Sequence, residues 1–224
     1  MLHISALLKK LSEAYGLSGH ESEIRSIVLD EFGQYADETR VDKVGNAIAL
    51  KRGYSKKQRR QIMFAAHMDE IGLMVSGISH GFLRVSSVGG VDPRVQLGQE
   101  VIVHAQRDLP GLISSTPPHL LKPEDRTKPV SIEQLWIDVG LSSQQANRLI
   151  RIGNLVSIRR EVIQLKNGLL AGKAFDNRAS VAALVVCLEQ LNQLHHDWDV
   201  VAVATVQEES TLLGATASAF GVAP

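Results

Sequence analysis

The sequence has no excess of charge of either sign, a single cysteine and no long apolar run. Lys and Arg together number 24, as do Asp and Glu, so no net field attracts nucleic acid or an anionic membrane. Cys187 has no partner for an intrachain disulfide, which is typical of a reducing compartment. No segment approaches the roughly 18 apolar residues that a membrane-spanning helix needs. These absences predict a soluble cytoplasmic protein that binds neither nucleic acid nor membrane.

We expect no signal peptide, and the sequence has no repeats or low-complexity tracts. Lys9 and Lys10 follow a short apolar stretch, whereas a signal peptide has its charges first. The basic run at 56–60 is expected to be a solvated loop. With 224 residues, 44% of them apolar and 21% charged, the chain suffices for one large domain or two modest ones.

Both ends of the chain have the pattern of an α/β domain. Apolar residues recur at helical spacing in three segments, which are 4–11, 24–32 and 179–194. Residues 39–42 and 46–51 predict a hairpin. Two short continuous apolar runs, 62–66 and 199–206, are typical of strands buried on both faces of a parallel sheet.

The middle of the chain has a different pattern. Short β-rich pieces punctuated by Gly and Pro occur at 82–85, 100–105, 111–114 and 155–158, with one amphipathic stretch at 142–149. This pattern is typical of a small β-barrel or sandwich. We therefore expect an α/β domain with a mixed sheet flanked by helices, formed by residues 1–72 and 164–224. An inserted β domain at 73–163 interrupts it.

Three polar clusters adjoin apolar segments of the predicted α/β domain. His67 and Asp69 follow the first buried strand, and Asp176 opens the long helix. Glu208 and Glu209 follow the second strand. Sites in open α/β sheets form beyond the carboxyl ends of the strands, so these clusters are placed to meet. Imidazole and carboxylate groups bind Zn²⁺ or Co²⁺, which predicts a metal site.

The spacing inside the clusters allows a division of roles. His67 and Asp69 are two residues apart on a strand end and point the same way, so Asp69 can accept the second imidazole N–H. Glu208 and Glu209 are adjacent, so one can bind metal while the other takes a proton from water. Each cluster alone also fits an ordinary structural His, a helix N-cap or a solvated Glu pair. Their occurrence together favours the metal site.

Longer motifs around these clusters resemble the M42 family of metallo-aminopeptidases. Three segments resemble its metal motifs, namely 67–72, 172–178 and 206–209. Three more resemble marks of its inserted domain, namely 89–95, 117–121 and 137–140. The motifs follow one another in the family's order over essentially the whole chain.

The resemblance implies a role for each matching residue. His67 would bind one metal, Asp176 would bridge two, and Glu209 would bind the second. Glu208 would be the general base that takes a proton from water, and Asp69 would orient His67. The resemblance further implies two Zn or Co ions, a zinc-peptidase-like sheet, and a PDZ-like inserted domain that joins subunits, commonly into a dodecamer. The substrates would be short peptides, cleaved one residue at a time from the free N-terminus.

The chain departs from the family pattern after Glu209. Family members continue to an Asp and a late His that complete the two metal sites, whereas residues 210–224 contain no Asp, Glu or His. Ser210, Thr211 and Leu213 also stand where the family has Val, Gly and Arg. We therefore expect a C-terminally truncated enzyme with weak or no activity. The alternative is a non-catalytic assembly subunit that pairs through its inserted domain.

Two other enzyme classes have weaker signals. Residues 77–81 match the G-x-S-x-G elbow of serine hydrolases, but a strand-like segment follows where the elbow needs a helix, so we expect a hairpin turn. Asp69 and Glu70 can be taken as a glycosidase pair, and some family members carry a cellulase label. Adjacent side chains on a strand end diverge, which disfavours that pair. We expect His104 to have no cluster of polar partners.

Overall fold

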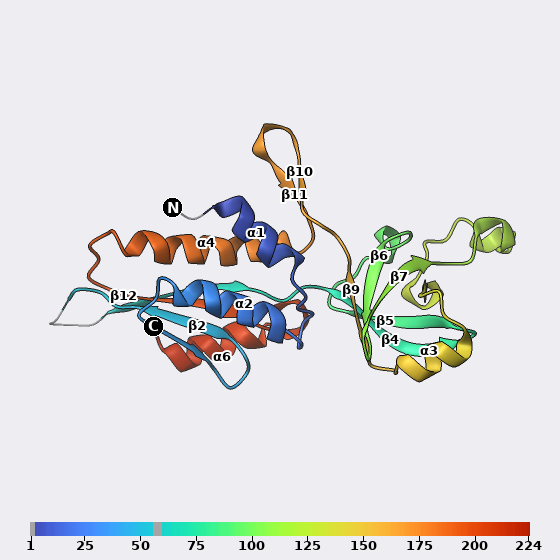
Figure 1. Cartoon of the computed structure of the whole chain (residues 1–224), viewed down its shortest axis with the longest axis horizontal. Coiled ribbons are helices and arrows are strands. Elements are labelled where there is room, and N and C mark those ends of the chain that lie inside the picture. Colours follow the sequence, from blue (N-terminus) through green and yellow to red (C-terminus); the bar gives the residue numbers. More distant parts are fainter. Residues whose placement is uncertain (1–2, 56–59) are drawn as a thin grey trace. The chain divides into compact units, whose positions relative to one another are not determined.

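The chain, described here by a computed structural model, folds as two compact units (Figure 1). The structure describes residues 3–55 and 60–224, so most of the basic run at 56–60 lies outside the described residues. One unit comprises residues 1–70 and 161–224, and the other comprises residues 71–160.

A mixed sheet forms the centre of the first unit. In the described residues its strand order is β1 (Glu38–Val41), β2 (Ala47–Lys51), β12 (Asp199–Thr205) and β3 (Gln61–His67). The β1–β2 and β2–β12 pairs are antiparallel, whereas β12 and β3 run parallel. The mixed sheet and the hairpin predicted from the sequence are therefore confirmed.

Helices pack against both faces of this sheet. The helices are α1 (Ile4–Glu13), α2 (Ser22–Gly33), α4 (Phe175–Leu191), the single turn α5 (Glu208–Thr211) and α6 (Leu213–Val222). The first three share a core with alternate strand residues such as Ala49 and Ala202. On the opposite face Val222 of α6 packs against Val201 and Val203. The alternation of side chains along a strand divides the core into these two layers.

Strand β3 differs from its predicted environment. Its apolar run predicted burial on both faces, yet Ile62 and Phe64 are 37% and 43% exposed. The reason is that, among the described residues, β3 pairs with β12 alone and so lies at the edge of the sheet. Strand β12 has neighbours on both sides and is buried at every position, as its sequence predicts.

The second unit is a closed β-barrel. Its strands follow the order β4 (Gly72–Ser79), β5 (Phe82–Val88), β8 (Trp136–Asp138), β7 (Asp108–Ser114), β6 (Glu100–His104) and β9 (Leu155–Ile158), with helix α3 (Ser143–Leu149) before β9. Alternate apolar side chains such as Leu73 and Val75 fill its interior. Strands β4 and β5 form a hairpin that turns at His80 and Gly81. The hairpin predicted at the G-x-S-x-G segment is confirmed, and a nucleophile elbow is ruled out there.

Short elements complete both units. Four 3₁₀ turns belong to the barrel unit: Pro93–Val95, Pro118–Leu120, Pro123–Asp125 and Ile132–Gln134. A small hairpin of β10 (Ile163–Gln164) and β11 (Leu170–Ala171), with the turn Lys166–Gly168, precedes α4 in the first unit.

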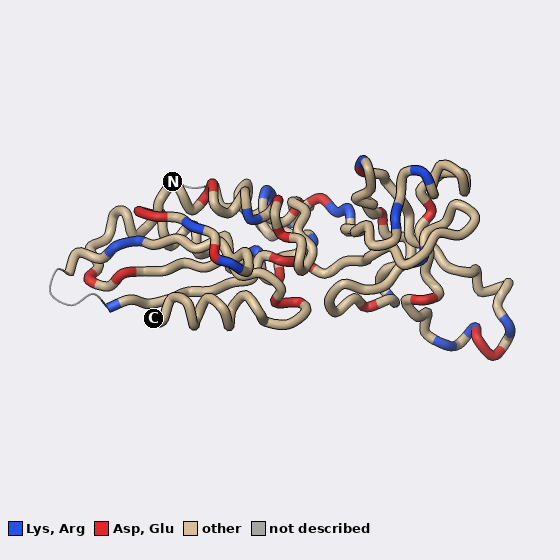
Figure 2. Tube along the Cα trace, turned by 90° about the horizontal axis from the view of Figure 1, so that it is seen from below, with Lys and Arg blue, Asp and Glu red and all other residues tan. Residues whose placement is uncertain are grey.

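Charged residues of both signs are interspersed along each unit (Figure 2). Several form local ion pairs, such as Lys9 with Glu13 at 3.9 Å and Lys128 with Asp125 at 2.8 Å. Exposed pairs of this kind contribute little to stability. Among the described residues, every helix is too short or too polar to span a lipid bilayer.

A buried arginine holds the α1–α2 connector against the sheet. Arg178 of α4 is 0% exposed, and its guanidinium donates to the carbonyls of Leu11 (2.9 Å), Ala14 (2.6 Å) and Met68 (2.9 Å). It also lies 3.6 Å from the carboxylate of Glu70. The guanidinium has five N–H donors in a rigid fork, against three on a lysine ammonium, so it can serve more carbonyls in fixed directions. Arg178 therefore joins helix α4, the connector and the end of β3.

We expect Arg178→Met to lower the free energy of unfolding by about 3–5 kcal/mol, since it leaves Glu70 partly unpaired and several buried carbonyls without donors. Urea unfolding followed by circular dichroism measures this. The matched control is Arg52→Met, which removes an exposed guanidinium paired with Glu38 and should change stability little. Equal stability of the two variants would contradict the anchoring role.

Candidate metal centre

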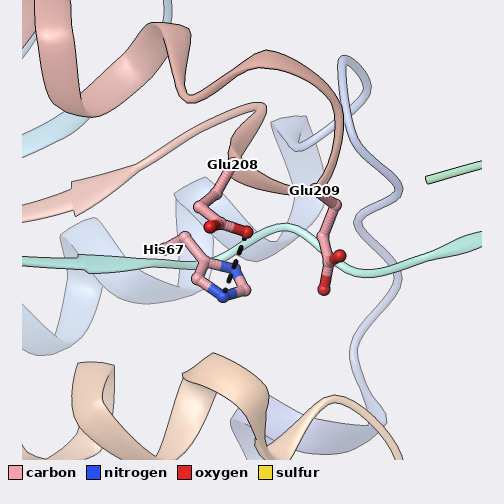
Figure 3. Close-up of side chains that lie close together, drawn as sticks. All are labelled: His67, Glu208 and Glu209. Atoms are coloured by element: carbon pink, nitrogen blue, oxygen red, sulfur yellow. Dashed lines mark ion pairs between the residues drawn. The ribbon is translucent and has the colours of Figure 1, made fainter. Parts of the chain in front are cut away.

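The carboxyl ends of the neighbouring strands β3 and β12 lie side by side at the same end of the sheet. The two strands are parallel, and Thr205 lies opposite His67 in their register. The amide of Met68 donates to the Thr205 carbonyl at 2.9 Å, which extends the pairing one step beyond the strands. The segment after β12 then brings Glu208 and Glu209 to the side chain of His67 (Figure 3).

All five predicted site residues are grouped at the His67 ring. Its Nε2 lies 3.1 Å from Oδ1 of Asp176 and 3.7 Å from Oε2 of Glu208. One ligand atom from each of His67, Glu208 and Glu209 can be chosen so that all three lie within 4.8 Å of one another. The His67 side chain is 7% exposed and that of Asp176 is 91% exposed. The grouping thus has a buried nitrogen at its base and an open carboxylate at its rim.

The fifth residue, Asp69, contacts more of the site than the sequence predicts. Its Oδ1 accepts the backbone N–H of Glu208 and its Oδ2 that of Glu209, both at 3.1 Å. The same Oδ1 lies 3.5 Å from Nδ1 of His67, which leaves Nε2 facing the other carboxylates. The carboxylate of Asp69 thus links the end of β3 to the start of α5.

Residues of the α1–α2 connector complete the surroundings, and the sequence analysis missed them. The Oε1 of Glu21 accepts the amides of Gly19 at 2.6 Å and Gln207 at 3.1 Å. Ser18 Oγ lies 2.7 Å from Ser210 Oγ. The contacts of Glu21 with Gln207 and of Ser18 with Ser210 join positions more than 180 residues apart in the chain. No local pattern of the sequence could have indicated them.

The electrostatics of the site follow from this crowding. Burial would lower the pKa of His67, but the hydrogen bond and charge of Asp69, with Asp176 and Glu208, outweigh it and raise the pKa to about 9. Burial alone would raise the pKa of Asp69, but its donors, with His67 first, lower it. The pKa of Glu209 is raised by burial and by neighbouring carboxylates, although His67 opposes this.

The donor set suits a divalent cation. An imidazole nitrogen and several carboxylate oxygens are the ligands that Zn²⁺ and Co²⁺ accept. The raised pKa of Glu209 reflects burial and repulsion among acidic groups, and a cation placed between them would relieve that repulsion. The residues present therefore fit a metal ion.

The neighbouring Glu70 belongs to the scaffold rather than to the site. Both of its carboxylate oxygens accept from Lys173 Nζ at 2.9 Å, and it is 4% exposed. Burial lowers the pKa of Lys173, with Glu70 opposing. Asp69 and Glu70 thus direct their carboxylates to different partners. This geometry does not provide the facing carboxylate pair of a glycosidase.

The expectation that His104 has no polar partners was wrong. Its Nδ1 lies 2.9 Å from Asp108 Oδ1 and its Nε2 lies 2.9 Å from Ser157 Oγ. These three residues lie on β6, β7 and β9, whose pairing in the barrel brings them together. Although the order resembles a catalytic triad, Ser157 lies within a strand and is 5% exposed, so its hydroxyl is screened from substrates.

Comparison with known proteins gives one consistent family. The family model of M42 glutamyl aminopeptidase matches residues 45–224. The lysyl aminopeptidase of Pyrococcus furiosus is 35% identical over 97% of this chain and 63% of its own length. The glutamyl aminopeptidase of Lactococcus lactis is 31% identical over 94% of this chain and 61% of its own. The chain thus spans about three fifths of the length of these relatives, 63% and 61%.

Solved structures agree with these relatives. A TET aminopeptidase from a marine sediment archaeon of the Thaumarchaeota is similar with a TM-score of 0.93 and 36% identity, covering 99% of this chain and 64% of that one. Pyrococcus horikoshii TET1 peptidase, which can assemble into a tetrahedron or a large octahedral shell, gives 0.84 and 33%, covering 96% and 64%. A Thermotoga maritima structure described as an endoglucanase gives 0.78 and 35%, covering 97% and 62%.

When metal is added to the metal-free protein at about pH 7.5, we expect His67 to release about one proton, because only the neutral imidazole binds metal. Because its pKa is raised to about 9, His67 is protonated at pH 7.5 and must lose a proton to bind metal. Above about pH 9 the imidazole is already neutral, so the proton release should decline as the pH rises through about 9. Calorimetric titration with Zn²⁺ in buffers of different ionisation enthalpy measures it. The control is His67→Ala, which should lose this pH-dependent proton. A release that stays constant from about pH 7 to 10 would contradict the prediction.

Proposed function

The chain belongs to the M42 glutamyl aminopeptidase family, and from that premise we propose that its first unit carries the site of a two-metal aminopeptidase. The substrates would be short peptides, shortened from the free N-terminus. The observation that carries the proposal is the group His67, Glu208 and Glu209, with ligand atoms within 4.8 Å of one another. The single Cys187 further favours a cytoplasmic location.

We assign one role to each site residue. His67 Nε2 and Asp176 would hold one Zn or Co ion, and Asp176 would be shared with the second ion, bound by Glu209. Glu208 would be the general base. Asp69 would orient the His67 ring. The hydrogen bonds that it accepts from the backbone amides of Glu208 and Glu209 suit a second role, in which it positions these two glutamates.

The chemistry proposed is hydrolysis of the first peptide bond. When bound, two divalent ions would polarise the scissile carbonyl and lower the pKa of the attacking water. Glu208 takes a proton from that water as it attacks the carbonyl carbon, and returns it to the leaving amine when the C–N bond breaks. Asp69 keeps Glu208 in place through the backbone amide, at 3.1 Å.

These 224 residues supply two ligands to each ion under this assignment. His67 and Asp176 serve one, and Asp176 and Glu209 serve the other. Catalytic zinc sites commonly have three protein ligands. We therefore propose that a polypeptide of these residues alone binds metal weakly and hydrolyses peptides slowly.

We further propose that residues 73–163 form a PDZ-like domain through which copies of the chain assemble into a homo-oligomer, up to the dodecamer of the family. The likeness to the shell-forming TET1 peptidase supports this. The same likeness favours one second candidate function, that of an assembly subunit without catalysis.

With added Co²⁺ or Zn²⁺, we expect slow hydrolysis of aminoacyl p-nitroanilides that chelation abolishes. Glu208→Gln should lower kcat by about 100-fold or more, because the proton acceptor is lost, while metal stoichiometry stays unchanged. Glu209→Gln is the matched comparison and should weaken metal binding instead. Turnover that survives Glu208→Gln would refute the assigned base, and turnover that survives complete metal removal would refute the metal-dependent class.

Assembly can be tested separately from catalysis. We expect light scattering to give a mass several times that of one chain, and replacement of residues 73–163 by a short Gly-Ser linker to yield a monomer. Circular dichroism of the shortened protein checks that the first unit stays folded. An unchanged oligomer after the replacement would place the main interface in the α/β unit.

A further inference from the structure

The segment that carries Glu208 and Glu209 is closed on itself at its two ends. Residues 206–214, here called the glutamate loop, follow β12, include α5 and enter α6. The amide of Gly214 donates to the carbonyl of Val206 at 3.1 Å, so the first and last residues of the loop are hydrogen-bonded to each other. The shape of the glutamate loop therefore depends on this junction.

One buried side chain, that of Asn46, binds both ends of the glutamate loop. Its Oδ1 accepts the amide of Val206 at 3.0 Å, and its Nδ2 donates to the carbonyl of Gly214 at 2.8 Å. Asn46 is 0% exposed and lies 160 and 168 residues before these partners in the chain. A side-chain amide has an acceptor as well as donors, whereas an ionised carboxylate has no donor and an aliphatic side chain has neither group. The amide of Asn46 can therefore bind an N–H and a C=O at once.

The turn between β1 and β2 holds Asn46 itself. The Oδ2 of Asp42 accepts from Nδ2 of Asn46 at 2.7 Å. The Oδ1 of Asp42 accepts three backbone amides of the turn, those of Val44, Gly45 and Asn46, at 3.1, 2.9 and 2.9 Å. The side-chain amide of Asn46 thus has partners for its oxygen and for both of its hydrogens, and it cannot rotate without losing them.

The junction has no room for a side chain at position 214. A Cβ built on Gly214 would lie 2.3 Å from the carbonyl oxygen of Val206 and 2.5 Å from Oδ1 of Asn46. Non-bonded atoms do not approach this closely, so the junction requires a glycine. Any larger residue must separate the end of the loop from Asn46.

Two residues of the glutamate loop have a backbone conformation that needs outside support. Gln207 has a φ of 56° and Leu212 a φ of 58°, in the left-handed region that is unfavourable for residues with a Cβ. They flank α5, which carries both glutamates. Such conformations persist where surrounding contacts fix them, and the hydrogen bonds of Asn46 lie just outside both residues.

We propose that Asn46 is a positioning residue of the metal centre, which clamps both ends of the glutamate loop and so determines where Glu208 and Glu209 lie beside His67. It acts through the backbone, since its hydrogen bonds go to the ends of the loop and to the β1–β2 turn. Asp69 binds amides in the middle of the same loop. The catalytic meaning of the inference rests on the proposed function, whereas the clamp itself does not.

Amide hydrogen exchange of the metal-free protein tests the clamp. Asn46→Ala is expected to speed exchange of the Glu208 and Glu209 amides by roughly threefold to tenfold, the effect of losing one hydrogen bond. These amides donate to Asp69 and not to Asn46, so their exchange reports the position of the loop. If Asn46 served stability alone, exchange of the β12 amides would speed up and that of the two glutamate amides would keep its wild-type rate.

Gly214→Ala disturbs the clamp from the loop side. Alanine favours a helix more than glycine does, so α6 should not be weakened by propensity, but the added Cβ must part the loop end from Asn46. We expect the same faster exchange of the Glu208 and Glu209 amides. The matched control is Gly221→Ala in the same helix, where an added Cβ has no heavy atom within 4 Å and exchange should stay unchanged. If Asn46→Ala fails to fold, this glycine pair decides the outcome.

Co²⁺ titration gives a second readout. Both Asn46→Ala and Gly214→Ala are expected to weaken Co²⁺ binding by about tenfold, because Glu209 is no longer held in place, whereas Gly221→Ala should bind as the wild type does. Wild-type exchange of the two glutamate amides together with wild-type Co²⁺ affinity in the first two variants would overturn the inference.

Equal effects of Gly214→Ala and Gly221→Ala on exchange would also overturn the inference, because the close contact at the junction would then be irrelevant. The expected exchange pattern in a protein without any peptidase activity would support the clamp and refute the proposed function. Wild-type exchange in all variants of an active peptidase would refute the clamp alone.

Discussion

The first unit depends on the buried charges of Arg178, Glu70 and Lys173. The end of α1 and the connector that follows it present several carbonyls to Arg178 of α4, and buried carbonyls need donors. Arg178 supplies them to Leu11 and Ala14, and Lys173 neutralises Glu70. With the connector held in this way, Glu21 and Ser18 reach both strand ends. The site therefore rests on a scaffold of fixed charge rather than on apolar packing alone.

This arrangement explains why acidic side chains tolerate one another near His67. Each segment of the site has a backbone hydrogen bond to a neighbour: Met68 to Thr205, Gln207 to Glu21, and Glu208 to Asp69. Backbone amide donors thus stabilise the negative charge of two of these carboxylates, Glu21 and Asp69. A preorganised site of this kind has little reorganisation to undergo when a cation arrives.

Elements with strong local patterns could be predicted from the sequence. The period of apolar residues predicted α1, α2 and the body of α4, and the continuous run at 199–206 predicted β12. The environment of β3 could not be predicted, because burial depends on how many strands flank it, and an apolar run is the same in an edge strand and a central one. Helix α6 was missed because it is apolar on all sides and has no helical period.

The candidate site, like the fold, could be predicted only in part from the sequence. Polar residues at strand ends can be predicted because strand direction places them at one edge of the sheet. The dual role of Asp69 could not be predicted, because its added partners are backbone amides. Nearly every residue has a backbone amide, so the sequence does not indicate which ones Asp69 contacts. Ser210 has the opposite character: its departure from the family residue was visible, but its meaning required the position of Ser18. A departure from a motif is thus informative once its spatial neighbour is known, and here that neighbour is the hydroxyl of Ser18.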